Sequence, residues 1–110
     1  MIEILKGKVK TVYDTDDAEK VHIEFHDKVT AGNGRLVEYP EGKGKVCCLI
    51  SALLFEKLEK FGIRTHYLGT EGLDTLVCRK LTIVPVEVIV RNIAAGSIVK
   101  TTTLQEGTLI

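Results

Sequence analysis

Hydrophobic and polar residues alternate along two stretches near the start of the chain. In residues 20–26, KVHIEFH, apolar and polar side chains alternate strictly, which is typical of a β-strand with one buried face. Residues 2–10 also read as a strand. Between the two lies DTDDAE, residues 14–19, and aspartate favours turns because its side chain binds nearby backbone groups. The pattern therefore predicts an antiparallel hairpin.

A helical period replaces the alternation in the middle of the chain. From residue 45 to residue 61, apolar residues recur with the i, i+3, i+4, i+7 spacing of a helix that buries one face. The predicted buried face consists of Val46, Leu49, Ile50, Leu53, Leu54, Leu58 and Phe61. Gly62 is suited to end this helix because glycine adopts a positive φ at little cost.

Strand patterns return in the second half of the chain, at residues 64–68, 75–84 and 86–93. Pro85 separates the last two, as expected for an edge strand or a break between strands. One long helix among mostly antiparallel strands predicts an α+β fold. The length of 110 residues fits a single domain over residues 1–110.

Composition narrows the class of protein. The chain has 15 basic and 15 acidic residues and no net charge, which argues against a general nucleic-acid or membrane-surface role. No apolar run reaches the roughly 18 residues of a membrane span. Its three cysteines are odd in number and two are adjacent, which indicates reduced thiols in the cytoplasm. No spacing of ligands predicts a metal site in this chain.

Three lysines near the N-terminus, Lys6, Lys8 and Lys10, alternate with Gly7 and Val9. On one extended strand these lysines would share a face, about 7 Å apart. Such a row favours an anionic ligand such as a polyphosphate, and Gly7 would let the backbone approach it closely. The alternative is a solvated edge strand that its lysines protect against pairing.

The stretch VRNIAAGS, residues 90–97, is a second candidate site. The planar guanidinium of Arg91 suits a carboxylate or a phosphate. Ser97, which follows Gly96, offers a hydroxyl and a backbone N–H to an anion. The alternative is a structural turn with a surface arginine.

Several stretches occur in the order and spacing of one known family. KGKVKTVY, VHIEFHDKVTAGNG, EGKGKV, FEKLEKFGIRTHYL and VPVEVIVRNIAAGSIVK closely resemble SAICAR synthetase, phosphoribosylaminoimidazole-succinocarboxamide synthase, over essentially the whole chain. The resemblance implies an N-terminal nucleotide-binding lobe like that of kinases, a β-sheet with one helix. It also implies a ligase of de novo purine biosynthesis. That enzyme joins carboxyaminoimidazole ribonucleotide (CAIR) to L-aspartate, uses ATP and Mg²⁺, and releases ADP and phosphate.

The resemblance also implies roles for individual residues. Lys8 and Lys10 would face the nucleotide phosphates, with Gly7 allowing close approach. Lys80 lies in residues 76–85, which resemble the segment whose backbone meets adenine. Asn33 belongs to a loop beside the substrates, and Lys43 to a helix start, which favours anions. The residues implied to bind the other substrates are Arg91, Asn92, Gly96, Ser97, Asn33 and Lys43.

The family continues beyond residue 110, and its Mg²⁺ ligands are expected in that further part. Three explanations stay open: a partial chain of the enzyme, one half of a split enzyme, or a non-catalytic nucleotide-binding or interaction module. An isolated lobe would expose apolar surface, which drives association. We therefore expect a homo-oligomer or a second chain that supplies the C-terminal lobe. The sequence departs from the family pattern at Cys47, Cys48 and Thr101.

Overall fold

The computed structural model describes the chain except for residues 1, 33 and 110, and except for the side chains of Ser97 and Thr101. The strands are β1 (Glu3–Lys6), β2 (Lys10–Asp14), β3 (Lys20–Phe25), β4 (Val29–Ala31), β5 (Leu36–Glu38), β6 (Tyr67–Glu71) and β7 (Thr75–Arg79). The helices are α1 (Lys43–Lys60) and α2 (Ser97–Thr101).

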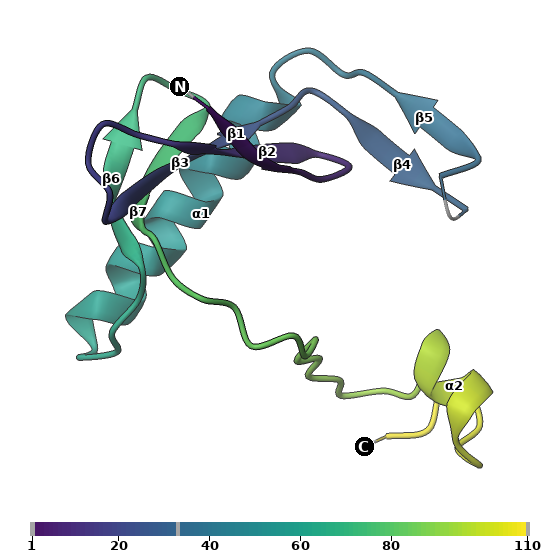
Figure 1. The fold of residues 1–110 in the computed structure, drawn as a ribbon. Coiled ribbons are helices and arrows are strands. Elements are labelled where there is room, and N and C mark those ends of the chain that lie inside the picture. The colour runs from purple at the N-terminus through teal and green to yellow at the C-terminus, as the bar shows by residue number, and fades with distance from the viewer. Residues whose placement is uncertain (1, 33, 110) are drawn as a thin grey trace.

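The main layer is an antiparallel sheet of five strands in the order β1-β2-β3-β7-β6. Helix α1 packs on one face of this sheet, against β3, β6 and β7 (Figure 1). The α+β class with one long helix is therefore confirmed, and so is the antiparallel hairpin across residues 15–19. The stretch predicted as one strand over residues 2–10, however, is divided between β1 and the first residue of β2.

The strand register decides which side chains face α1. Val21 pairs with Cys78, and Ile23 pairs with Leu76; partners in register lie on the same face of a sheet. The buried core on this face consists of Val21, Cys48, Ala52, Tyr67, Leu76 and Cys78, with Val12, Ile23, Phe25 and Phe55 packed against it. The core therefore lies between α1 and the central strands.

The helix contacts the sheet through small residues. Gly44, Cys48 and Ala52 are buried, whereas all seven residues of the predicted apolar face are exposed. That prediction is wrong about which face is covered, although the helix itself is confirmed. Small side chains let the helix backbone approach the sheet closely, and a helical period alone does not say which face meets a partner.

Both ends of α1 depend on glycine. Gly42, the N-terminal cap, has a φ of 83°. At the other end Gly62 has a φ of 81°, its N–H donates to Glu59 O at 3.0 Å, and the N–H of Ile63 donates to Leu58 O at 3.1 Å. These are the bonds of a glycine C-terminal cap, so Gly62 ends the helix as predicted.

Other strand predictions differ from the structure. The strand predicted over residues 64–68 begins at Tyr67 and continues to Glu71, while β4 and β5 form a hairpin that the sequence pattern did not indicate. The strand predicted over 75–84 ends at Arg79, and residues 80–92 contain no strand. A strand requires a pairing partner, and apolar β-branched residues do not by themselves provide one.

The last part of the chain extends away from the sheet. Ala94 is fully buried within a small turn unit, where its N–H donates to Thr108 O at 2.7 Å. Figure 1 shows α2 and the end of the chain apart from the sheet. The radius of gyration of 16.6 Å accordingly exceeds the about 13 Å of a compact domain of 100 residues. Within the described chain, no helix has the length and apolar character that crossing a membrane requires.

Candidate functional site

An apolar cavity of about 200 Å³ lies beneath the hairpin of β1 and β2, on the face of the sheet that α1 partly covers. Its lining comes from four strands, from the residue before β6 and from the segment that follows β7. It comprises Ile4, Leu5, Val12, Val21, Ile23, His66, Cys78, Arg79, Lys80, Leu81 and Ile83. Pockets that hold a whole drug-sized ligand measure about 300–1,000 Å³. This cavity fits a smaller flat group, such as a nucleobase, with the rest of the ligand outside.

A tight turn at residues 7–9 joins β1 to β2 at the Phe25 end of β3. The N–H of Gly7 donates to Lys10 O at 2.8 Å, and the N–H of His26 donates to Val9 O at 2.8 Å. A Cβ on Gly7 would lie 3.3 Å from Lys10 O, closer than most side chains tolerate. Gly7 is therefore accounted for by the turn itself, and its close approach to a ligand stays a prediction.

The three lysines do not form a row on one face, so that prediction is wrong. Lys6 is the last residue of β1 and pairs with Thr11, whereas Lys10 pairs with Phe25 on the core side of the sheet. Lys8 lies exposed within the turn. The reason is that the turn reverses the chain at Gly7, which places Lys6 and Lys10 on opposite faces.

Two of the predicted lysines lie on the cavity side of the sheet. The ammonium of Lys10 lies 5.9 Å from the ring centroid of Phe25. Lys80, which lines the cavity, forms an ion pair with Asp14 at 3.0 Å. Lys80, the residue after β7, therefore reaches the cavity, whereas Lys10 on β2 lies on the same side of the sheet but does not line it.

Two titratable groups that line the cavity, His66 and Cys78, have pKa values shifted toward their neutral forms. Burial, and then the charge of Lys10, lowers the pKa of His66, whose ring also packs against Phe55 at 5.3 Å. Burial raises the pKa of Cys78 to about 11 and, together with the charge of Asp74, raises that of Cys48. A thiol becomes a nucleophile only as the thiolate, so these two cysteines are structural. His66 was not predicted, because nothing in its local pattern links it to the lysines.

The start of α1 is held by a carboxylate. Asp27 accepts the N–H of Gly42 at 2.9 Å and of Gly44 at 2.7 Å, and these bonds, the one from Gly44 first, lower its pKa. The two N–H groups are therefore not available to a substrate anion. Lys43 lies half-buried between them, and its role in binding stays a prediction. Asp27 was missed because it precedes the helix by a whole hairpin.

The second group of predicted residues lies in the segment before α2. Nη1 of Arg91 donates to Ala95 O at 2.7 Å, and a Cβ on Gly96, whose φ is 67°, would lie 3.5 Å from the same nitrogen. The structure therefore brings Arg91 and Gly96 together, with Asn92 exposed beside them. Asn33 and the side chain of Ser97 lie outside the described residues.

The residues around the cavity and the residues around Arg91 form two separate groups in this structure. Among the described residues, α2 makes no packing contact with any strand of the sheet or with α1, and Figure 1 shows α2 apart from both. The same residues contain no group of three or more histidine, cysteine, aspartate or glutamate side chains that would hold a metal ion. A site that uses both groups has to bring them together.

Comparison with known proteins decides the family. The family model for SAICAR synthetase matches residues 3–110. The chain belongs to the SAICAR synthetase family. The phosphoribosylaminoimidazole-succinocarboxamide synthase of Methanocaldococcus jannaschii is 47% identical over 111 residues, which cover 96% of this chain and 46% of that protein.

Solved structures of SAICAR synthetases have the same fold. A SAICAR synthetase (Type-2) in complex with ADP superposes with a TM-score of 0.84 at 39% identity, covering 96% of this chain and 45% of that one. The synthase from Ehrlichia chaffeensis superposes with a TM-score of 0.85 at 33% identity, covering 98% of this chain and 46% of that one. This chain therefore spans about half the length of the SAICAR synthetases that it matches.

Proposed function

We propose that residues 1–110 form the N-terminal nucleotide-binding lobe of an ATP-dependent ligase. The reaction joins CAIR to L-aspartate and yields SAICAR, ADP and phosphate, in the cytoplasm. The observation that carries the proposal is the apolar cavity lined by Lys80, with Lys10 on the same side of the sheet. A similar structure, 39% identical to this chain, was solved in complex with ADP.

Adenine fits the cavity because its walls are largely apolar side chains on rigid strands. The base would lie against Val12, Val21 and Leu81, which line the cavity from three different parts of the chain. The phosphates would extend toward the turn at residues 7–9 and meet Lys8 and Lys10. Each cation–phosphate contact near a surface contributes up to a few kcal/mol before salt screening.

Mg²⁺ would accompany the nucleotide. Mg²⁺ commonly binds through substrate phosphates and one or two carboxylates and keeps several waters, so it does not need a protein cage. When bound, it would offset the charge of the transferring phosphoryl group. The carboxylates are expected in the part of the family that follows residue 110.

The other substrates would contact the second group of residues. We assign CAIR and L-aspartate to Arg91, Asn92, Gly96 and Ser97, with Asn33 and Lys43 on the sheet side. Arg91 holds the loop through the bond from Nη1 to Ala95 O, and a guanidinium is the group suited to bind a carboxylate or phosphate. The residues near the cavity and those around Arg91 would be joined into one site either by the part of the protein that corresponds to the second half of its relatives or by a second chain.

Calorimetric titration of the chain with ATP and with inorganic tripolyphosphate tests the proposal. If the cavity holds adenine, ATP binds at least tenfold more tightly than tripolyphosphate, because only ATP places a base in the cavity. The double variant Lys8→Ala, Lys10→Ala weakens both ligands. The matched control Lys20→Ala removes a lysine at the far end of β3 and leaves both affinities unchanged.

Equal affinity for ATP and tripolyphosphate would contradict the adenine cavity. Unchanged ATP affinity in the double variant would contradict the phosphate role of the lysines. Nucleotide binding without CAIR-dependent ADP release would favour the non-catalytic module for the chain by itself.

A further inference from the structure

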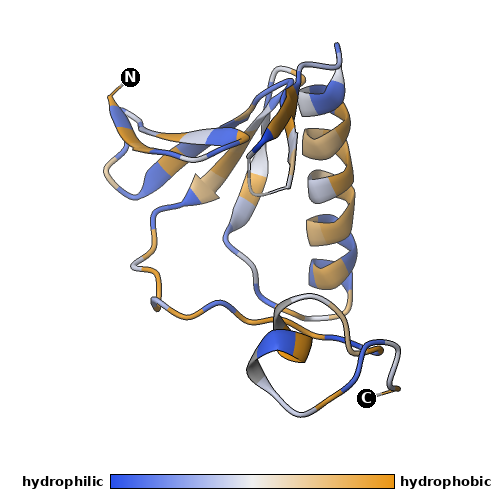
Figure 2. Ribbon diagram, turned by 90° about the vertical axis from the view of Figure 1, so that its right-hand side faces the viewer, coloured by the Kyte–Doolittle hydropathy of each residue, from blue (hydrophilic) through white to orange (hydrophobic). Residues whose placement is uncertain are grey.

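One wall of the cavity beneath the β1–β2 hairpin is not part of the sheet. Leu81 and Ile83 line the cavity but lie beyond the end of β7 at Arg79, in a segment that Figure 2 shows leaving the sheet as an extended chain. Among the described residues, the segment 81–90 makes no backbone hydrogen bond to the sheet. The position of this wall therefore depends on how the segment is attached where it begins.

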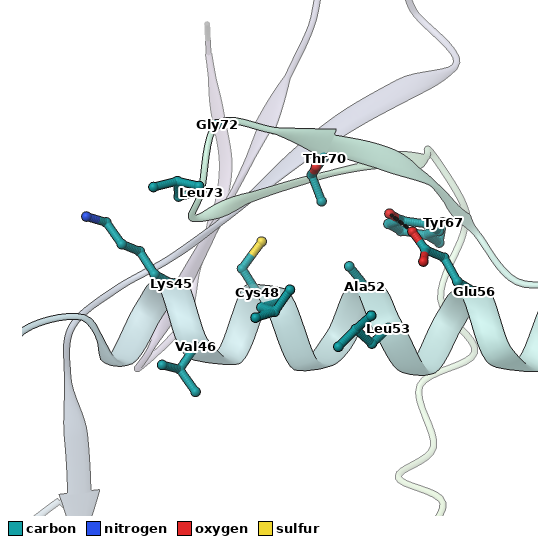
Figure 3. A pocket seen from close by; sticks show the side chains of 11 residues that line it. Lys45, Val46, Cys48, Ala52, Leu53, Glu56, Tyr67, Thr70, Gly72 and Leu73 are labelled. Carbon is teal, nitrogen blue, oxygen red and sulfur yellow. Dashed lines mark hydrogen bonds between the residues drawn. The ribbon is translucent and has the colours of Figure 1, made fainter.

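The other sides of the cavity are fixed by the sheet and by α1. Most of the lining belongs to strands that pair in register. His66 directly precedes Tyr67, whose ring stacks on Phe55 of α1 with 5.7 Å between the ring centroids. The hydroxyl of Tyr67 also donates to the carboxylate of Glu56 at 3.1 Å (Figure 3). Only the wall after β7 lacks such support within the described chain.

Lys80 attaches this segment to the sheet through two bonds. Its N–H donates to Glu19 O at 2.7 Å, and its ammonium donates to the carboxylate of Asp14 at 3.0 Å. Asp14 is the last residue of β2 and pairs with Val21 of β3, so the ion pair connects β2 to the segment after β7 across the start of β3. The N–H of Asp14 in turn donates to Ile2 O at 2.7 Å.

The ion pair also limits what Lys80 contributes to binding a ligand. A lysine whose charge is offset by a carboxylate adds little attraction for a phosphate. The proposed phosphate contacts lie at the turn of residues 7–9, whereas Asp14 lies at the opposite end of β2, about 13 Å along the strand. Lys80 therefore acts on the part of the cavity that the base would occupy.

We propose that Asp14 is a positioning residue for the nucleotide: through Lys80, it fixes the segment after β7 as the wall against which the base lies. This inference rests on the proposed nucleotide-binding function of the cavity. The side chains of Lys80 and Asp14 are 47% and 38% exposed, and exposed ion pairs contribute little. We therefore expect the pair to contribute a factor of roughly two to five in affinity.

Calorimetric titration of Asp14→Asn with ATP and with inorganic tripolyphosphate tests this inference. The variant should bind ATP more weakly by this factor, and tripolyphosphate no more weakly than the wild type does, because only the base uses the wall. Removing a negative charge would by itself strengthen the binding of both anions. The direction of the change therefore separates positioning from electrostatic attraction. Asp14→Glu keeps the carboxylate and should bind ATP nearly as tightly as the wild type.

A double-mutant cycle tests whether Asp14 acts through Lys80. Lys80→Met removes the charge and keeps a long side chain, and it should weaken ATP binding about as much as Asp14→Asn does. The double variant should bind no more weakly than either single variant, because the two residues form one contact. Asp17→Asn is the matched control: it removes the same charge from an exposed ion pair with Lys20, at 3.8 Å, and should leave both affinities unchanged.

Amide hydrogen exchange, followed by NMR without ligand, measures the attachment of the segment itself. The amide of Lys80, which donates to Glu19 O, should exchange faster in Asp14→Asn and at the wild-type rate in Asp17→Asn. An unchanged rate in Asp14→Asn would overturn the inference, and so would equal weakening of ATP and tripolyphosphate. An Asp14→Asn variant that keeps the full wild-type preference for ATP would overturn this inference alone. Equal affinity of the wild type for the two ligands would overturn the proposed function, and this inference with it.

Discussion

Replacing Gly44 with alanine should destabilise the chain, although alanine is the better helix former. Gly44 is buried at the first turn of α1, where a Cβ would lie 2.6 Å from the backbone oxygen of Phe25 and 3.1 Å from Oδ1 of Asp27. Backbone cannot move aside as a flexible side chain does. The start of the helix would therefore have to retreat from the end of β3, which also strains the bond from the Gly44 N–H to Asp27.

The magnitude follows from two opposing effects. Helix propensity favours alanine by roughly 0.8–1.0 kcal/mol, whereas forcing an extra group into a packed site costs roughly 1–3 kcal/mol, occasionally more. With the strained hydrogen bond added, we expect a net loss of about 1–2 kcal/mol. For a domain of this size that lowers the Tm by roughly 4–12 °C.

Thermal unfolding followed by circular dichroism measures this loss. Lys45→Ala is the matched control, since Lys45 is the next residue and is exposed; its Tm should change little or rise slightly. The carboxyl carbon of Asp27, followed by NMR during an acid titration, should show a pKa closer to the ordinary 3.8 in the Gly44→Ala variant, because a bond that lowers it is weakened. A Tm for Gly44→Ala equal to or above that of the wild type would refute the close contact.

Three further predictions concern Asp27, the core residue Leu76 and the cysteines. Because the folded pKa of Asp27 lies below its ordinary 3.8, its stabilising effect is present above pH 3.8 and is lost as the pH falls through the folded pKa; urea unfolding across this acidic range should show a smaller decline in Asp27→Asn. Leu76→Ala should cost about 2–5 kcal/mol, measured by the same unfolding, because Leu76 is 2% exposed in the core; a loss below 1 kcal/mol would contradict its packing. A thiol reagent should modify half-buried Cys47 first and reach Cys78 only on unfolding, since burial raises the pKa of Cys78 to about 11; equal rates in the native protein would contradict this burial.

Local sequence patterns predicted correctly the features that depend on residues close together in the chain. The period of α1, its end at Gly62 and the turn after β2 all follow from side-chain spacing and from the φ values that glycine adopts. The identity of Cys48 as the buried member of the adjacent pair also agrees with helix geometry, which directs at most one of two successive residues to the core. The resemblance of the motifs to SAICAR synthetase was confirmed by the family comparison.

Tertiary structure decided the features that depend on distant partners. The predicted apolar face of α1 has the period of a buried face, yet the sheet packs on Gly44, Cys48 and Ala52, because close approach of the two backbones favours small side chains. Residues 86–93 have the composition of a strand but, apart from an isolated bridge between Ile93 and Leu109, they pair with no other part of the described chain. Asp27 reaches the start of a helix that lies beyond an intervening hairpin. The sequence determines which apolar faces need to be buried and which polar groups need a hydrogen-bond partner. Which partner each one finds depends on the elements that the fold brings into contact.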